Sequence, residues 1–453
     1  MLKIEGGCRS PCSALCSAWR PNQSRRSTPM SKNSVNQELT VVSTETREAF
    51  DELSESFDRF CLRTGLEALE TLMAEEVEQL CGPSHARDDQ QAYRWGSTKG
   101  EVPFHGGKVQ IKRPRVRDKS GKEKPLDSYL EARDHALLSR WAMNQMLLGV
   151  TTRRFGRSVR LPEGDIPRQD GDGTSKSAVS RRFVALSQVK MQEWLQQDLS
   201  DLDLLVIQID GLVVNKHSMI AAMGIDTKGI KHPLSLMEGA TENHVVVQAL
   251  LDDLIERGVN PKRAMFFLLD GSKALSKAVR NTYGQLALIQ RCQVHKSRNI
   301  LDRLDEAMKI SVRKALRQAW DAESPELAEK LLRNLANRLK STNQQAAASI
   351  LEGLDEILCL IRLGLPPELR KALATTNAIE NMMGTIRRVT RNVKRWKNSN
   401  MRLRWTAAGM LEAKKGFQRL RAYRQLPHLK AKLEEHTQKV LAETSLQKQS
   451  EAA

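Results

Sequence analysis

Residues 204–211 read LLVIQIDG, and residues 264–271 read AMFFLLDG. Each run is apolar, has the length of a buried strand, and ends in Asp-Gly. Asp210 and Asp270 are therefore expected at the ends of two core strands. Carboxylate oxygens are hard ligands that suit Mg²⁺ or Mn²⁺, and a pair of carboxylates can support phosphoryl transfer if a third acid joins them. The alternative is that each Asp-Gly only turns the chain after a strand.

The residues around these two runs extend the pattern. Strands are predicted at 218–226 and 231–237, joined by a turn at 226–229. Helices are predicted at 242–257 and 273–283, and a further strand at 286–290. Strands that alternate with helices imply right-handed crossovers and parallel pairing. The order of three meandering strands, helix, strand, helix, strand resembles that of a ribonuclease-H-like core.

Composition indicates the class of partner. The chain of 453 residues has a net charge of +18, and only 4% of its residues are aromatic. A basic chain of this kind favours a nucleic-acid backbone as partner, although a solvated basic surface without a partner is the alternative. No run of 18 apolar residues is present, so no membrane span is expected. The seven cysteines are odd in number and scattered, which is typical of reduced thiols in a cytoplasm.

The first 200 residues are expected to hold a disordered extension at 1–40 and a mostly helical, basic DNA-binding region at 41–200. Helical periodicity runs from 48 to 81. A short basic strand is predicted within 94–117, where alternating cations present charge to a phosphate backbone unless they only form a solvated face. Its candidate DNA-binding residues are Arg94, Lys112, Arg113, Arg115 and Arg117.

A helix that opens within residues 173–182 resembles the recognition helix of a helix-turn-helix. It is expected to be capped by a serine, to start with small polar residues, to carry cations on its first turns and to continue to 199. Lys176, Arg181 and Arg182 are its candidate DNA-binding residues. A plain capped helix is the alternative interpretation.

Residues 290–299 read QRCQVHKSRN and follow the last predicted strand. Cys292 and His295 have the spacing of half a zinc site, but no second pair completes tetrahedral coordination. A packed cysteine and a hydrogen-bonding histidine that shape the active site are the favoured reading. Lys296 and Arg298 beside them are candidate DNA contacts. Residues 301–373 show only helical periodicity and are predicted to form an all-helical insertion.

The third acid is sought in residues 374–425. Glu380 is near the start of a predicted helix, and the residues from 381 to 411 are basic without an acidic one. Asn377 and Glu380 also have the spacing of a capping box, which needs no chemistry, so the residues alone leave both readings open. Residues 426–453 are predicted to be a polar, frayed tail. Candidate DNA-binding residues after Glu380 are Arg387, Arg388, Arg391, Lys394 and Arg395.

Four motifs together carry a family resemblance over about residues 45–420. They are Asp210-Gly211, Leu269-Asp270-Gly271, the 290–299 block and the TTNAIE sequence at 375–380. These motifs resemble the signature of mutator-type insertion-sequence transposases. The resemblance implies an α+β or α/β, RNase-H-like catalytic core with a helical insertion. It also implies a DDE triad of Asp210, Asp270 and Glu380, so it favours chemistry over a capping box at Glu380. Residues 1–40 and a loop at about 162–173 depart from the family pattern.

The same resemblance implies how the protein works. Two Mg²⁺ ions, or Mn²⁺, would be bound by Asp210, Asp270 and Glu380, and DNA would be cleaved and then joined to target DNA. The partners would be the terminal inverted repeats of the element and target DNA, bound by a homodimer or higher oligomer in a bacterial cytoplasm, associated with the nucleoid. Two alternatives stay open: a non-catalytic DNA-binding regulator derived from a transposase, and an RNase-H-like nuclease without strand transfer.

Overall fold

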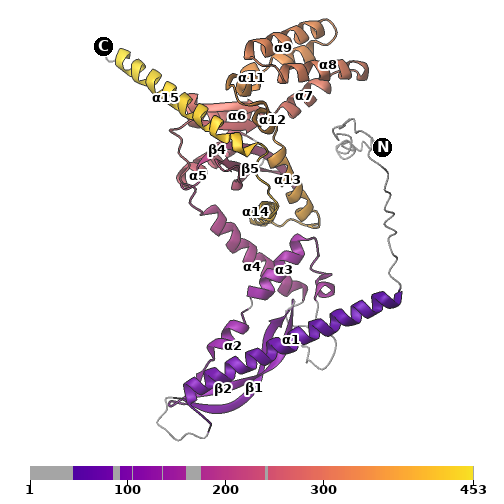
Figure 1. The fold of residues 1–453 in the computed structure, drawn as a ribbon, viewed down its shortest axis with the longest axis vertical. Helices are drawn as coiled ribbons and strands as arrows, with labels where there is room; N and C mark the ends of the chain where they lie inside the picture. Colours follow the sequence, from indigo (N-terminus) through magenta and orange to yellow (C-terminus); the bar gives the residue numbers. More distant parts are fainter. Residues whose placement is uncertain are drawn as a thin grey trace, which may run out of the picture. The chain divides into compact units, whose positions relative to one another are not determined.

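A computed structural model describes most of the chain (Figure 1). The extension predicted for 1–40 and the loop predicted at 162–173 lie outside the described residues. The chain forms two compact units, Met1–Ser56 and Phe57–Ala453, and helix α1 (Thr44–Cys81) begins in the first and ends in the second. The described residues are 44–84, 92–104, 106–134, 136–159, 175–239 and 243–451.

A five-stranded sheet forms the centre of the second unit. Its spatial order is β6-β5-β4-β7-β8; β4, β5 and β6 pair antiparallel, and β7 pairs parallel with both β4 and β8. The predicted strands, their order along the chain and the parallel pairing are confirmed. The strands are β4 (Leu204–Val214), β5 (His217–Asp226), β6 (Lys231–Gly239), β7 (Met265–Leu269) and β8 (Ala287–Arg291).

Helices cover both faces of this sheet. Helices α5 (His244–Glu256) and α6 (Lys273–Tyr283) bury their apolar sides against one face, where they enclose Ile207 and Phe267. On the other face, α13 (Asn377–Thr390) and α14 (Ser399–Lys415) pack on the half of the sheet formed by β4, β5 and β6. The sheet therefore holds its strands between two apolar layers, which makes it a rigid support for side chains at its edge.

The prediction that β4 ends at Asp210-Gly211 is wrong. The strand continues to Val214, and the hairpin turns instead at Asn215 and Lys216, whose φ angles are 48° and 67°. Two consecutive positive φ angles are typical of the type I′ turn, whose twist matches that of the flanking strands. Asp210 consequently lies inside a strand, and its side chain is on the same face of the sheet as that of Gln208.

Residues 293–451 are all described, and they contain helices and no strand. The predicted helical character of 301–373 is confirmed, and the helices from α7 to α11 enclose an apolar core of their own. The prediction of a polar tail after 426 is wrong, because α15 (Leu426–Glu451) buries Leu426, Leu429 and Leu433 next to β7. The remaining helices are α7 (Gln293–Leu301), α8 (Glu306–Trp320), α9 (Pro325–Lys340), α10 (Gln344–Leu351), α11 (Leu354–Arg362) and α12 (Pro367–Leu373).

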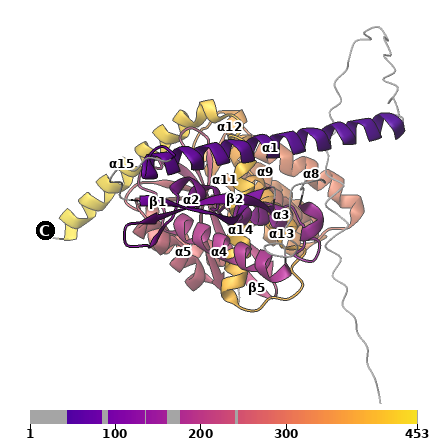
Figure 2. The same ribbon diagram turned by 90° about the horizontal axis from the view of Figure 1, so that it is seen from below.

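The region predicted to be mostly helical contains a second sheet. Strands β1 (Ala92–Phe104), β2 (Gly107–Asp118) and β3 (Glu123–Lys124) pair in that order, and α2 (Asp127–Ala132) follows them. The long helix α1, seen from two directions in Figures 1 and 2, packs on this sheet through Met73 and Val77. β1 was missed because its sequence has two glycines and several charges rather than an apolar alternation.

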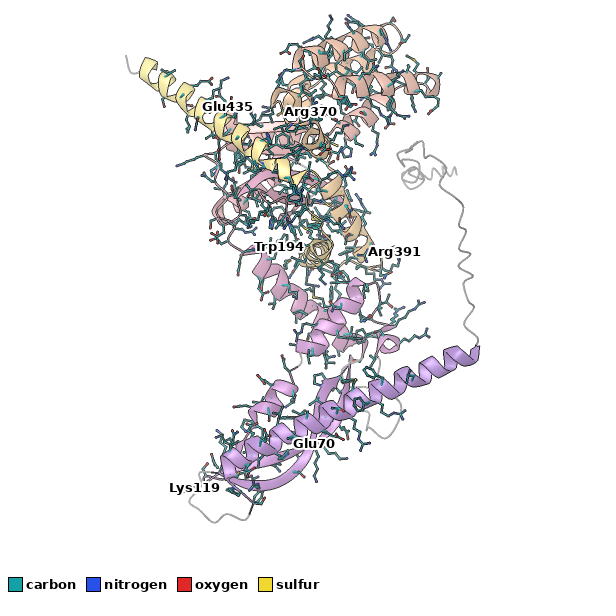
Figure 3. The ribbon with its side chains drawn as sticks, viewed as in Figure 1. Glu70, Lys119, Trp194, Arg370, Arg391 and Glu435 are labelled. Carbon is teal, nitrogen blue, oxygen red and sulfur yellow. The ribbon has the colours of Figure 1, made fainter. Side chains whose placement is uncertain are left out.

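Helices α3 (Ala136–Leu147) and α4 (Lys176–Leu195) follow. The predicted serine cap is present: Ser175 is the N-cap of α4, and its side chain accepts a hydrogen bond from the backbone N–H of Ala178 at 3.2 Å. Residues 148–175 separate the two helices in sequence, whereas a helix-turn-helix has a turn of about three or four residues. Trp194, labelled in Figure 3, donates from Nε1 to the Pro233 carbonyl of β6 at 2.9 Å. α4 is therefore attached to the central sheet as a packed helix.

Among the described residues, no helix combines the length and apolar character that crossing a membrane requires.

Candidate active site

Three carboxylates come together from three different elements. Asp210 lies within β4, Asp270 follows the last residue of β7, and Glu380 lies in the first turn of α13. Ile209 and Leu269 are directly opposite each other in the parallel pair β4–β7, so the next residue of each strand is an acid. The backbone N–H of Ile379 donates to Oε1 of the buried Gln208 at 3.1 Å, which fixes the start of α13 over β4.

The carboxylates repel one another in a partly buried place. Burial, together with the negative charges of Asp270 and Glu380, raises the pKa of Asp210 from its ordinary 3.8 to about 6. A hydrogen bond from the Gly211 N–H at 2.8 Å and the nearby His295 oppose this rise without cancelling it. In the described part of the chain, no lysine or arginine forms an ion pair with any of the three acids. The site therefore has an excess of negative charge.

The loop after Asp270 is rigid. The Asp270 Oδ1 accepts a hydrogen bond from the Ser272 N–H at 2.8 Å. Gly271 has a φ of 103°, and the Arg291 side chain packs so closely on it that a Cβ at this position would lie 2.0 Å from the guanidinium Nε. Only glycine combines this backbone conformation with this close approach. The hydrogen bond and the close packing on Gly271 thus restrict the position of the Asp270 carboxylate.

The capping box that the spacing of Asn377 and Glu380 allows is not formed. Helix α13 begins at Asn377, so Asn377 is its first helical residue and Thr376 is its N-cap. The fully buried Thr376 does not cap the helix backbone with its side chain; its hydroxyl donates instead to Glu380 Oε1 at 2.6 Å. The Glu380 carboxylate is consequently held by a side chain and is not used to satisfy the helix backbone.

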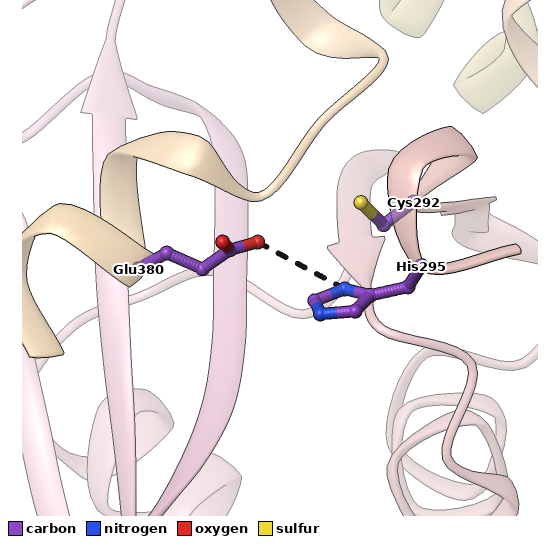
Figure 4. Close-up of side chains that lie close together, drawn as sticks. All are labelled: Cys292, His295 and Glu380. Carbon is purple, nitrogen blue, oxygen red and sulfur yellow. Dashed lines mark ion pairs between the residues drawn. The ribbon is translucent and has the colours of Figure 1, made fainter. Parts of the chain in front are cut away.

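Cys292 and His295 lie next to Glu380, at the start of α7 (Figure 4). His295 Nδ1 is 3.9 Å from Glu380 Oε1, and the ligand atoms of Cys292, His295 and Glu380 all lie within 4.8 Å of one another. The Thr376 Oγ1 lies 3.3 Å from the Cys292 sulfur and 3.4 Å from His295 Nδ1, in addition to its bond to Glu380. The Thr376 hydroxyl thus contacts all three side chains.

The charges of these groups are linked. The hydrogen bond to Cys292 raises the pKa of His295, and the carboxylates of Glu380 and Asp270 raise it further, against the opposite effect of burial. Burial alone would raise the pKa of the Cys292 thiol, but its hydrogen bonds with His295 and Thr376 lower it overall. The pKa of His295 therefore lies above its ordinary value, which increases the cationic fraction of the imidazole beside the acids.

The predicted DNA-binding residues that follow the core strands differ in exposure: one is buried and the others are exposed. Lys296 is 1% exposed and donates to the Glu352 carbonyl at 2.7 Å; burial lowers its pKa to about 8. The prediction that Lys296 contacts DNA is therefore wrong, because its ammonium joins α7 to the connection between α10 and α11. The side chains that are exposed instead are Arg298, Arg387, Arg388, Arg391, Lys394 and Arg395.

The predicted cations of α4 lie at its start, where Lys176 and Arg181 are exposed and Arg182 is partly buried. Burial lowers the pKa of the Arg182 guanidinium, and the neighbouring charge of Arg181 lowers it further. The Phe183 ring, next to Arg182 in sequence, packs on that of Trp405 with centroids 4.4 Å apart. Lys176 and Arg181 are consequently the most exposed of these three cations.

Most predicted cations of the second sheet have partners inside the chain. Arg94 donates to the carbonyls of Gly82 and Pro83, just after α1, at 2.7 and 3.3 Å. Arg113 and Arg115 both bind the carboxylate of Glu123, at 2.9 and 2.7 Å, and Arg117 lies over the Trp95 ring with its Cζ 4.2 Å from the centroid. Lys112 differs, because it is exposed and lies directly opposite the exposed Lys99 of β1.

Two residues of the site were missed from the sequence. Gln208 is a polar residue within an apolar run, two positions before Asp210, and that interruption was the available signal. Thr376 lies in the TTNAIE motif, but a threonine four residues before an acid has no distinctive spacing of its own. Both are buried, and both act on the same helix: one fixes the α13 backbone and the other fixes the Glu380 side chain.

Known proteins resemble this chain over most of its length. A family model described as "Transposase, Mutator family" matches residues 34–420. The chain therefore belongs to the Mutator family of transposases. A transposase for insertion sequence element IS905 from Lactococcus lactis subsp. lactis is 25% identical over 350 residues, which cover 74% of this chain and 84% of that protein.

Two further relatives agree with this family. A probable transposase for an insertion sequence element from Corynebacterium diphtheriae is 30% identical over 222 residues, which cover 48% of this chain and 63% of that protein. The transposase for insertion sequence element IS256 in transposon Tn4001 from Staphylococcus aureus is 24% identical over 340 residues, which cover 72% of this chain and 82% of its own length.

Proposed function

We propose that this chain cleaves DNA at the terminal inverted repeats of its element and joins the freed end to target DNA. The reaction would use Asp210, Asp270 and Glu380 as a DDE triad on an RNase-H-like core. The observation that carries the proposal is the meeting of three carboxylates at one end of the β4–β7 pair, where burial and the charges of the other two acids raise the pKa of Asp210. The strand order β6-β5-β4-β7-β8 supports the assignment of the core.

The donor set fits two Mg²⁺ ions, or Mn²⁺. All three groups are carboxylates, which are hard oxygen ligands, and no lysine or arginine of the described chain neutralises them by an ion pair. When bound, such ions supply charge stabilisation and a more acidic water for an in-line displacement at phosphorus. The residues that would hold them are Asp210, Asp270 and Glu380. Bound cations would also relieve the repulsion that raises the pKa of Asp210.

The protein's own part is to hold the three carboxylates in place. Asp210 is fixed by a strand that is paired on both sides, and Asp270 by the loop that Arg291 packs against. Glu380 is longer and more flexible, and the Thr376 hydroxyl orients it. When protonated, His295 would place a positive charge near Glu380 that can face a phosphate. Such support by neighbouring groups is what keeps metal-binding side chains in a productive geometry.

The test of this function is a DNA-processing assay. The full chain is incubated with DNA that carries the ends of its element, with and without Mg²⁺, and nicked, excised and joined products are separated. Metal-dependent nicks and joined products are expected. Nicks without any joined product would identify an RNase-H-like nuclease, and specific binding without nicks would identify a non-catalytic regulator.

Because two ends must be joined, we expect a homodimer or higher oligomer on paired ends, to be measured by light scattering.

His295→Ala is expected to slow cleavage about tenfold to a hundredfold, the range over which groups that support metal ligands act. The melting temperature and the affinity for the repeat should stay close to those of the wild type, because the His295 side chain is partly exposed. Thr376→Val should have a similar effect, whereas Thr376→Ser keeps the hydroxyl and should retain most activity.

A structural zinc ion at Cys292 and His295 would give the opposite pattern. In that case purified protein would hold stoichiometric zinc, and both a chelator and His295→Ala would unfold it, because the free energy of metal binding is free energy of folding. Elemental analysis and a melting curve in chelator distinguish the two roles. Stoichiometric zinc, or unfolding by the chelator, would falsify the site-shaping role.

The sheet of β1 and β2 is proposed to contact the terminal repeats through Lys99 and Lys112. Two like charges directly opposite each other on neighbouring strands repel, and a phosphate between them removes that repulsion. The double change Lys99→Gln with Lys112→Gln should weaken repeat binding and lower the slope of log affinity against log salt by about two, since each phosphate contact contributes roughly 0.9. Binding titrations at several salt concentrations measure the slope. Lys262→Gln with Lys277→Gln removes the same charge elsewhere and should leave the slope almost unchanged.

A further inference from the structure

A polar groove lies beside α13, apart from the carboxylate site. Its cavity volume is about 920 Å³. Gln208 and Lys231 of the central sheet line it, together with α13, the end of α14 and the segment that follows α14. Gln208 is also the residue that binds the Ile379 backbone, two positions before Asp210. The groove is therefore built on the same strand and the same helix as the carboxylate site.

Cations dominate this groove. Lys231, Lys371, Arg388, Lys415 and Arg421 line it, against one acid, Glu412. Glu412 is already bound to Lys415 at 2.6 Å. The other four cations have no ion pair or side-chain hydrogen bond among the described residues. Burial lowers the pKa of the Lys231 ammonium, which shows that its charge is partly removed from water. Four cations without partners in one hollow concentrate a positive potential that attracts anions.

The shape and chemistry of the wall indicate a polymer. Asn377, Asn381, Thr385 and Arg388 line the groove at intervals of four, four and three residues, so they form one face of α13. At 1.5 Å per residue this row extends for roughly 16 Å. Phosphates along one strand of duplex DNA are about 3.4 Å apart along the axis, so a row of this length spans several of them. Amide and hydroxyl groups between the cations can also bind sugars and base edges.

We propose that this groove binds the backbone of a DNA strand that extends past the cleavage point, with Lys371, Arg388 and Arg421 as its phosphate contacts. The inference rests on the proposed function and gives it a second DNA-binding surface besides the carboxylate site. A DNA partner would explain why cations without partners in the chain lie beside α13. In the second sheet, by contrast, Arg113 and Arg115 pair with Glu123 and Arg117 lies over the Trp95 ring.

The test uses the full chain with the triple change Lys371→Gln, Arg388→Gln and Arg421→Gln. All three side chains are exposed, so the fold should be kept, and a melting curve checks this. The matched control removes three exposed lysines on other elements: Lys262→Gln, Lys277→Gln and Lys330→Gln. The probe is a duplex that carries one end of the element with flanking DNA beyond it. Affinity is measured at several salt concentrations, and cleavage is measured with saturating protein.

The groove variant is expected to bind the probe at least tenfold more weakly than the control and to lower the salt slope by about two to three. The charge-preserving variant Lys371→Arg, Arg388→Lys and Arg421→Lys should restore affinity. Equal affinity and equal slope in the groove variant and the control overturn the proposal, and so does a charge-preserving variant that binds as weakly as the neutral one.

These outcomes are separate from those of the proposed function. If the wild type does not cut DNA but the groove variant still loses affinity and salt slope, the groove stands and the catalytic proposal fails. If the wild type cuts DNA and the groove variant binds as the control does, the catalytic proposal stands and the groove fails.

Discussion

Asp210→Asn, Asp270→Asn and Glu380→Gln are each expected to reduce DNA cleavage by roughly a thousandfold or more. An amide has nearly the shape of the carboxylate but no charge, so it is a poor ligand for a hard cation. The stabilisation that such cations provide in phosphoryl transfer amounts to several kcal/mol, and each 1.4 kcal/mol corresponds to a factor of ten in rate. All three changes are conservative in volume, so the fold around β4, β7 and α13 should be kept.

The measurement is single-turnover cleavage of a duplex that carries the end of the element, with Mg²⁺ and with Mn²⁺. Repeat affinity serves as the internal control, because the proposed DNA contacts are on other side chains. Asp252→Asn on α5 is a matched control, since this exposed acid lies outside the site and should cut at the wild-type rate. A triad variant that cuts at nearly the wild-type rate would remove that residue from the proposed triad.

Asp210→Asn should also stabilise the protein when no divalent cation is present. The pKa of Asp210 is raised in the folded protein, from 3.8 to about 6, so the folded state binds this proton more tightly than the unfolded state does. The resulting stabilisation is complete below about pH 4 and is lost as the pH rises through 6. At pH 8 the ionised Asp210 then costs up to about 3 kcal/mol, which the asparagine variant avoids.

Urea unfolding in chelator at pH 5 and pH 8 measures this effect. The free energy of unfolding of Asp210→Asn should exceed that of the wild type at pH 8 and approach it at low pH. Mg²⁺ or Mn²⁺ should stabilise the wild type and have a much smaller effect on the variant, since a ligand stabilises the state that it binds.

Asp203→Asn supplies a control of opposite sign. Arg263 and Lys430 bind Asp203 and outweigh its burial, so its pKa is lowered and its loss should destabilise the protein at pH 8. An Asp210→Asn variant that is no more stable than the wild type at pH 8 would contradict the repulsion among the three carboxylates.

The sequence by itself determined the central sheet. Five strands, the helices between them and the parallel pairing of β4, β7 and β8 follow from the apolar runs and from the crossover helices. It also identified Asp210, Asp270 and Glu380 as candidates, because a family motif is read from residue types and spacing. These features are local, or they depend on neighbouring elements along the chain, and the periodicity of apolar residues encodes such features directly.

The tertiary structure alone decided which side chains serve the site. Lys296 has the same charge as Arg298 two residues later, yet one is buried against Glu352 and the other is exposed. Thr376 reaches Cys292 and His295 across 84 and 81 residues of sequence, and Gln208 reaches Ile379 across 171. The groove beside α13 likewise collects cations from β6, α12, α13 and the segment after α14. Residue type and spacing carry no record of such contacts, because they form only when elements that are distant in sequence pack together.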